Sequence, residues 1–64
     1  IYRVSIDNRF SGKTWADYAK HMVDEHYVPI GISRDDENLV NPEPSFVLRD
    51  GDEAFIVSHE PPVL

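Results

Sequence analysis

The residue types best suited to metal chemistry are two histidines and a run of acids. His21 and His26 stand five positions apart in a predicted helix, so their side chains point about 140° away from each other. Zinc-binding pairs on a helix usually lie three or four positions apart. Asp35, Asp36 and Glu37 offer several carboxylate oxygens, although their spacing is not that of an EF-hand loop. We expect a turn there, with a divalent-cation site at these three residues as the alternative.

Residues for covalent or phosphate chemistry are sparse. The chain has no cysteine, and its serines lie in no catalytic motif. Gly12-Lys13-Thr14 matches only the last part of a phosphate-binding P-loop, although Lys13 at a helix N-terminus could meet an anion. We therefore predict a binding or interaction module and not an enzyme.

The charge balance narrows the class of partner. The chain carries 12 acidic and 6 basic residues, a net charge of −6. Binding to nucleic acid or to an anionic membrane needs clusters of Lys and Arg, so we expect neither partner. No apolar run reaches the length of a transmembrane helix, and we expect a soluble segment without membrane insertion.

The length of 64 residues allows one small domain. A domain of this size can barely bury enough apolar surface by itself, and no disulfide is available to stabilise it. We therefore expect either a homodimer or a domain docked on a parent protein. Because the chain begins with Ile1 and not Met, we also expect it to come from a longer protein.

One amphipathic helix is predicted from about Trp15 to Glu25. Thr14 is a suitable N-cap, and Asp17 follows three positions later, near the positive end of the helix dipole. His26 is expected on the apolar face at the end of this helix. The apolar face is expected to comprise Trp15, Tyr18, Ala19, Met22 and Val23.

The remaining pattern predicts strands. Residues 1–6 alternate as a half-buried strand does, and 27–34 forms a second strand with Val28, Ile30 and Ile32 on one face. A turn at 35–38 leads to a short strand at 39–40, giving a hairpin. The later segments are an extended one around Pro42 and Pro44, a short apolar one at 45–48, a turn at Asp50-Gly51 and a central strand at 53–58. The predicted fold class is α+β: a small mixed or antiparallel sheet covered by one helix, in the order β-α-β-β-β.

Four of these segments together resemble a known family. They are the Gly12-Lys13-Thr14 helix start, the strand ending in Arg34, the Pro-containing segment, and the turn from Val47 to Asp52. Their order resembles the C-terminal domain of RCK/TrkA-type regulators of potassium channels and transporters. The resemblance covers residues 1–59, which leaves 60–64 as a tail or linker. In the turn, Gly51 reverses the chain and Asp52 can accept backbone N–H bonds.

The resemblance implies a cytoplasmic regulatory domain attached to a Rossmann-like domain of a membrane channel or transporter. Such domains dimerise and bind an effector between two copies, for example a cyclic dinucleotide or Ca²⁺. The implied ligand-binding residues in the dimer cleft are His21, Met22, Val28 and Pro44. Met22 and Val28 stand where relatives have an arginine and a polar residue, so a divalent cation or small neutral ligand fits better than an anionic nucleotide. The alternative is a purely structural assembly domain of a membrane transporter or antiporter, without its own ligand.

Overall fold

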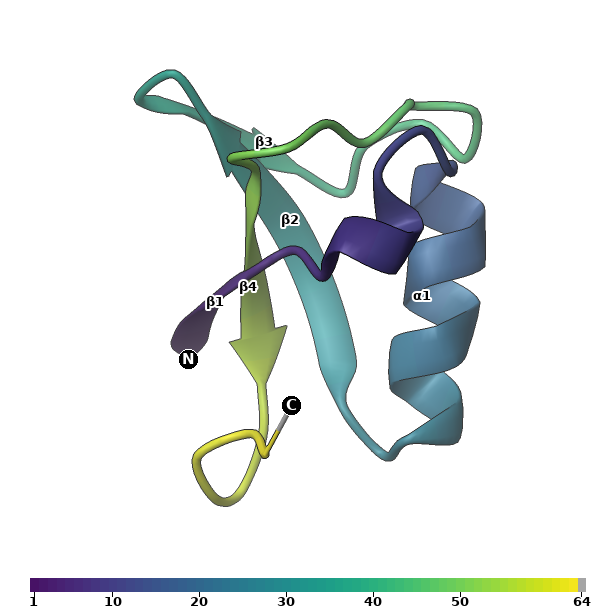
Figure 1. Cartoon of the computed structure of the whole chain (residues 1–64). Coiled ribbons are helices and arrows are strands. Elements are labelled where there is room, and N and C mark those ends of the chain that lie inside the picture. The colour runs from purple at the N-terminus through teal and green to yellow at the C-terminus, as the bar shows by residue number, and fades with distance from the viewer. Residues whose placement is uncertain (64) are drawn as a thin grey trace.

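The computed structural model describes residues 1–63 and shows one four-stranded antiparallel sheet with a helix packed on one face (Figure 1). The strand order in the sheet is β1-β4-β2-β3. The α+β class is therefore confirmed, and the sheet is antiparallel throughout. In chain order the elements are β1 (Tyr2–Ser5), the 3-10 helix η1 (Asn8–Phe10), α1 (Trp15–Asp24), β2 (Val28–Arg34), β3 (Glu37–Val40) and β4 (Glu53–Val57).

The core lies between α1 and the sheet. Strand β4 runs between β1 and β2, so it is one of the two inner strands of the sheet, as its apolar composition predicts. Its inward-facing residues, Ala54 and Ile56, are fully buried together with Ile32 of β2. The helix contributes Trp15, Tyr18 and Met22, and Leu48 from the segment before β4 completes the buried cluster.

The start of α1 follows the local sequence signals. The Thr14 hydroxyl oxygen accepts a hydrogen bond from the backbone N–H of Asp17 at 3.3 Å, as an N-cap does. The predicted apolar face wrongly includes Val23, however, because Val23 is 58% exposed. Packing against β2 buries a narrow stripe at Trp15, Tyr18 and Met22, and Val23 falls beside it.

The end of α1 also corrects a prediction. His26 is exposed and has a φ of 67°, so it lies beyond the helix in the left-handed region and not on an apolar face. Its N–H donates to the carbonyl of Val23, and that of Tyr27 donates to the carbonyl of Met22. These two bonds form a Schellman motif, which satisfies the last carbonyls of the helix.

A β-bulge in β2 changes which residues face the core. The register against β4 shifts between Pro29 and Gly31, leaving Ile30 as the extra residue. The prediction that Val28, Ile30 and Ile32 share one face is therefore wrong. Ile32 is fully buried under the helix, whereas Val28 is 54% exposed opposite Val57 of β4.

The predicted β2–β3 hairpin is confirmed, with a shorter turn than expected. Asp35 and Asp36 have φ values of 49° and 65°, which is the pattern of a two-residue type I′ turn. Strand β3 consequently begins at Glu37 and not at 39. The apolar segment at 45–48 forms no strand and makes one isolated bridge, between Thr14 and Val47.

The end of the described chain has no regular structure from residue 58 to 63. The backbone N–H of Val63 donates to the hydroxyl of Tyr27 at 3.1 Å, so this segment returns toward the start of β2. The predicted tail at 60–64 includes Leu64, which lies outside the described residues.

Candidate functional site

The turn before β4 is held by a buried ion pair. The Asp52 carboxylate is 2% exposed and accepts bonds from Arg34 Nε at 2.8 Å and Arg34 Nη2 at 2.6 Å. It also accepts the backbone N–H of Arg49 at 2.9 Å, and Gly51 has a φ of 88°. Gly51 and Asp52 therefore have the geometry of the pinned turn that the sequence predicts.

The electrostatics of this pair follow from its surroundings. Burial favours the neutral form of the Asp52 carboxyl, but the hydrogen bonds from Arg34 and Arg49 outweigh it and hold its pKa below the usual value. The hydrogen bond to Asp52 in turn raises the pKa of Arg34. Both side chains are therefore charged at neutral pH.

Arg34 joins three parts of the chain. Besides Asp52, its guanidinium donates to the carbonyl of Val47 at 2.9 Å and lies 4.6 Å from the centre of the Phe46 ring. From the sequence, Arg34 was predicted only to end a strand, and its pairing with Asp52 was not predicted. The sequence does show an arginine at the end of β2 and an aspartate in a Gly-Asp turn. Their separation of 18 positions, however, does not indicate that the two side chains meet.

The segment before α1 is tied to the segment before the turn. Gly12 N–H donates to the carbonyl of Leu48 at 2.8 Å, and Leu48 N–H donates to the carbonyl of Lys13 at 2.8 Å. The first helical amides are also used: Trp15 N–H donates to Phe46 and Ala16 N–H to Pro44. The backbone amides at the start of the helix thus donate to carbonyls of the same chain. In a P-loop, the equivalent amides would donate to phosphate.

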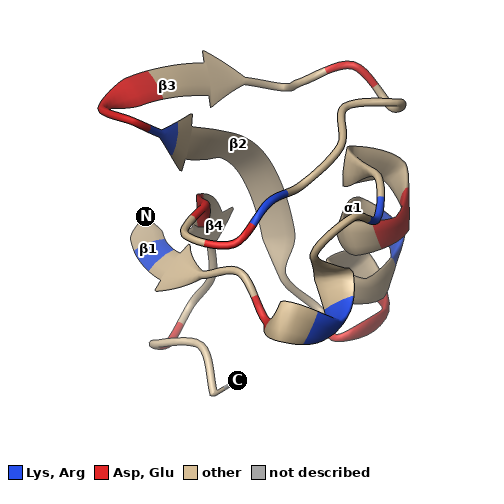
Figure 2. Cartoon of the chain, turned by 45° about the horizontal axis from the view of Figure 1, so that its top comes forward, with Lys and Arg blue, Asp and Glu red and all other residues tan. Residues whose placement is uncertain are grey.

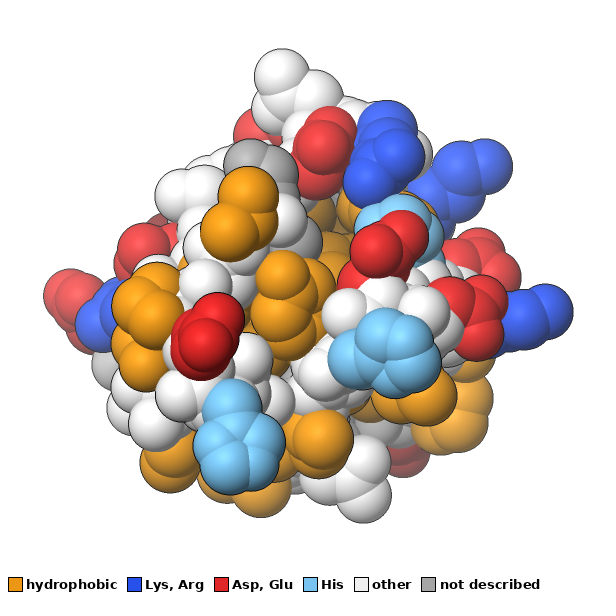
Figure 3. Space-filling view, turned by 90° about the horizontal axis from the view of Figure 1, so that it is seen from below, with side chains coloured by type: hydrophobic (Ala, Val, Ile, Leu, Met, Phe, Trp, Pro, Cys, Tyr) orange, Lys and Arg blue, Asp and Glu red, His pale blue; other side chains and the backbone are white. Residues whose placement is uncertain are grey.

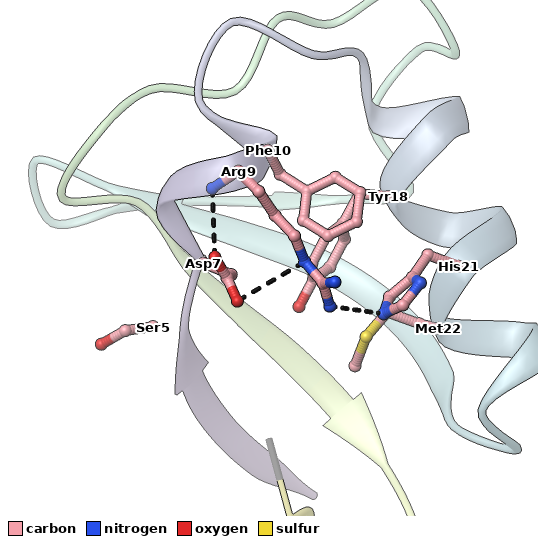
Figure 4. Close-up of a pocket in the computed structure, with 7 residues that line it drawn as sticks. All are labelled: Ser5, Asp7, Arg9, Phe10, Tyr18, His21 and Met22. Carbon is pink, nitrogen blue, oxygen red and sulfur yellow. Dashed lines mark hydrogen bonds and ion pairs between the residues drawn. The ribbon is translucent and has the colours of Figure 1, made fainter.

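A small pocket opens between β1, η1 and α1 (Figure 4). Its volume is about 50 Å³, which is room for a few water molecules. His21 and Met22 both line it, and Met22 is only 1% exposed. The lining residues are Ser5, Asp7, Arg9, Phe10, Tyr18, His21 and Met22.

Arg9 organises the polar side of this pocket. Figure 4 shows its guanidinium between Asp7 and His21: Nε lies 3.5 Å from Asp7 Oδ2, and Nη2 lies 3.0 Å from His21 Nε2. Because a guanidinium only donates, Nε2 of His21 accepts and the ring proton sits on Nδ1. Burial and the Asp7 carboxylate together raise the pKa of Tyr18 to about 12, so its hydroxyl is neutral here.

The four predicted ligand-binding residues do not meet within one chain. His21 and Met22 share the pocket just described. Pro44 lines a separate groove beside Trp15 and Ala16 near the start of α1, and Val28 lines neither. Any site that uses all four needs a second copy to bring them together.

The predicted cation residues lie at the tip of the β2–β3 hairpin, away from α1 (Figure 2). Asp35 and Asp36 form the two-residue turn, and Glu37 begins β3. In the part of the chain that the structure describes, no three His, Cys, Asp or Glu side chains are grouped to hold a metal ion. We therefore assign Asp35 and Asp36 to the turn and Glu37 to the first position of β3.

The remaining histidines lie at the end of the molecule where α1 and β4 finish. A shallow hollow there is lined by Glu25, His26, Tyr27 and residues 58–61 with Val63. Figure 3 views this end and shows histidine and acidic side chains at the surface around it. None of them joins a metal-binding group within residues 1–63.

Over residues 1–63, the structure contains no helix of the length and apolarity needed to cross a membrane. No protein-family model, curated protein or solved structure matches this chain.

Proposed function

We propose that this chain is a regulatory module of the RCK/TrkA C-terminal type, which acts on a potassium channel or transporter from the cytoplasm. In this proposal it follows a Rossmann-like domain, dimerises, and changes transport when an effector binds between two copies. A ligand shifts such an equilibrium only by its difference in affinity for the two states.

The observation that best supports the proposal is the way the motif segments join. The Gly12-Lys13-Thr14 segment pairs with Leu48 through two hydrogen bonds, and Arg34 pairs with Asp52 through two more. These segments are far apart in the sequence, and they are three of the four on which the resemblance depends. The motifs are thus parts of one hydrogen-bonded unit.

The pocket around His21 limits the effector that one copy could hold. Its volume of about 50 Å³ is well below the roughly 300–1,000 Å³ of typical small-molecule sites. A small neutral molecule fits this volume, whereas a divalent cation would need ligands from the second copy, because Arg9 pairs with both Asp7 and His21 here. A nucleotide effector would have to lie across the surface grooves of two copies.

The test is thermal unfolding with Ca²⁺, Mg²⁺, Zn²⁺ and a panel of nucleotides, each added separately. A ligand that binds only the folded state at about 100 times its Kd stabilises it by about 2.7 kcal/mol, so we expect one of them to raise the melting temperature. His21→Ala should reduce that shift, and His59→Ala, away from the pocket, should leave it intact. If none of these ligands raises the melting temperature, the effector-binding part of the proposal is wrong.

A structural assembly domain without its own ligand is the second candidate. The observation in its favour is that the first amides of α1 are already used by the chain, at Phe46 and Pro44. This candidate predicts a melting temperature that rises with protein concentration and does not respond to any added ligand. A stable monomer would contradict both candidates.

A further inference from the structure

Strand β3 ends the sheet on one side and presents apolar side chains there. The sheet order places β1 and β3 at its two edges. Leu39 and Val40 of β3 are 36% and 82% exposed. The β1 edge carries Arg3, which bonds to Glu53 and Ser33, and a charged residue is a common guard against edge pairing. The β3 edge has apolar residues at the corresponding place.

The backbone of β3 has groups directed away from the sheet. In an antiparallel pair of strands, every second residue forms two backbone hydrogen bonds with the residue that faces it, and the residues between them form none. Asn41 N–H donates to the carbonyl of Ile30 at 2.8 Å, which sets this alternation along the β2–β3 register. Leu39 and Glu37 therefore bond to β2, whereas the N–H and C=O groups of Asn38 and Val40 point outward.

We propose that β3 pairs with β3 of a second copy of this chain, antiparallel, across a two-fold axis at Leu39. Asn38 then faces Val40 of the second copy, and their backbone N–H and C=O groups form two hydrogen bonds. Val40 likewise faces Asn38 of the second copy, and that pair forms two more. Leu39 faces Leu39 of the second copy as a non-hydrogen-bonded pair. The two four-stranded sheets become one continuous sheet. This inference rests on the dimer of the proposed function and names its surface.

This register suits two identical copies. Glu37 would face Asn41 of the second copy, so no carboxylate faces another across the new strand pair. An apolar groove of about 480 Å³ runs beside β3, lined in part by Leu39, Val40, Pro42 and Phe46. Leu39 of the second copy would fill part of it. A two-fold interface uses the same surface of both copies; in this register Leu39 faces its own counterpart and Asn38 faces Val40.

Cysteine cross-linking tests the register. The chain has no cysteine, so in a single-cysteine variant a disulfide between two protein cysteines can form only between copies. Residues facing each other in a non-bonded antiparallel pair have Cα atoms about 4.5 Å apart, within the disulfide range of about 4.4–6.8 Å. We expect Leu39→Cys to give nearly complete disulfide-linked dimer in a glutathione redox buffer. Val23→Cys is the control, because Val23 is more exposed than Leu39 but lies on α1.

A backbone variant tests the hydrogen bonds. Val40→Pro removes an outward N–H and leaves the bonds between β2 and β3 in place, as proline at a strand edge can do. We expect sedimentation equilibrium to show a dimer dissociation constant at least about tenfold higher than for the natural chain, since two inter-copy bonds are lost. Val40→Thr keeps the N–H and should dimerise as the natural chain does. Circular dichroism of both variants checks that the fold is retained.

The outcomes separate this inference from the proposed function. Equal cross-linking of the Leu39→Cys and Val23→Cys variants, or equal dimerisation of the Val40→Pro and Val40→Thr variants, would overturn edge pairing at β3. A natural chain that is dimeric in those cases still fits the proposed function, through another surface. A natural chain that is monomeric at all concentrations would overturn both, and the ligand-induced melting shift measures effector binding independently of either result.

Discussion

The Arg34 guanidinium and the Asp52 carboxylate form a two-bond pair, at 2.8 and 2.6 Å, between the end of β2 and the turn before β4. Asp52 is almost fully buried, and Arg34 keeps a 21% exposed side chain. The pair also holds the Arg49 amide and, through Arg34, the Val47 carbonyl. Removing one partner therefore frees several polar groups at once.

We expect Asp52→Ala to lower the free energy of unfolding by about 2–3 kcal/mol, because Arg34 and the Arg49 amide lose a charged acceptor. Urea denaturation measures the change. Asp50→Ala is the matched control, since Asp50 is exposed in the same turn and should change stability by less than about 0.5 kcal/mol. Equal effects of the two variants would contradict the pinned turn.

The same pair predicts a loss of stability in acid. The pKa of Asp52 is lower in the folded chain than its ordinary value, so the unfolded chain binds this proton more readily. The contribution of Asp52 is thus complete above the unfolded pKa of about 3.9 and is lost as pH falls through the folded pKa. Unfolding free energies between about pH 2 and 6 should fall more steeply toward acid in the natural chain than in Asp52→Asn. Parallel curves would show that Asp52 does not carry this dependence.

Adjacent residues on α1 should differ sharply in their effect on stability. Met22 is fully buried and Val23 is largely exposed. Met22→Ala should cost about 2–5 kcal/mol by leaving a cavity, whereas Val23→Ala should change stability by less than about 0.5 kcal/mol. Thermal and urea unfolding of both variants measures this difference. A large loss from Val23→Ala would indicate that Val23 is buried, for example against another copy.

The left-handed conformation of His26 predicts a stabilising substitution. Its φ of 67° is strained for a residue with a Cβ and free of that strain for glycine. We expect His26→Gly to raise the free energy of unfolding by roughly 0.5–1 kcal/mol, the usual benefit of relieving such strain. His59→Gly serves as the control outside the Schellman motif and should not stabilise. A loss of stability in His26→Gly would show that the imidazole makes a favourable contact.

Much of the fold was predictable because its signals are local. Thr14 and Asp17 set the start of α1 through a hydrogen bond between near neighbours, and the alternation in residues 1–6 predicts the half-buried strand observed at Tyr2–Ser5. The β2–β3 hairpin likewise depends on a turn of two adjacent aspartates. In each case the residues that decide the structure lie within a few positions of one another.

The candidate site was predicted less well, because its contacts join distant residues. His21 and Met22 do share a pocket, but Arg9, which binds His21, comes from η1, on the other side of the 11–14 loop. Pro44 and Val28 lie elsewhere, at the groove beside α1 and on β2. The spacing of these residues in the sequence contains no signal for which of them meet.

The sequence by itself determined that α1 is a helix and that the four main β segments are strands, together with the helix cap and the Gly51-Asp52 turn, since each depends on neighbouring residues and their backbone preferences. Only the tertiary structure decided that a bulge at Ile30 turns Val28 away from the core, that the sheet buries Met22 and not Val23, and that Arg34 is the partner of Asp52. These three depend on how strands and helix pack. Packing brings together side chains 18 positions apart, as it does for Arg34 and Asp52, and local preference cannot choose among such partners.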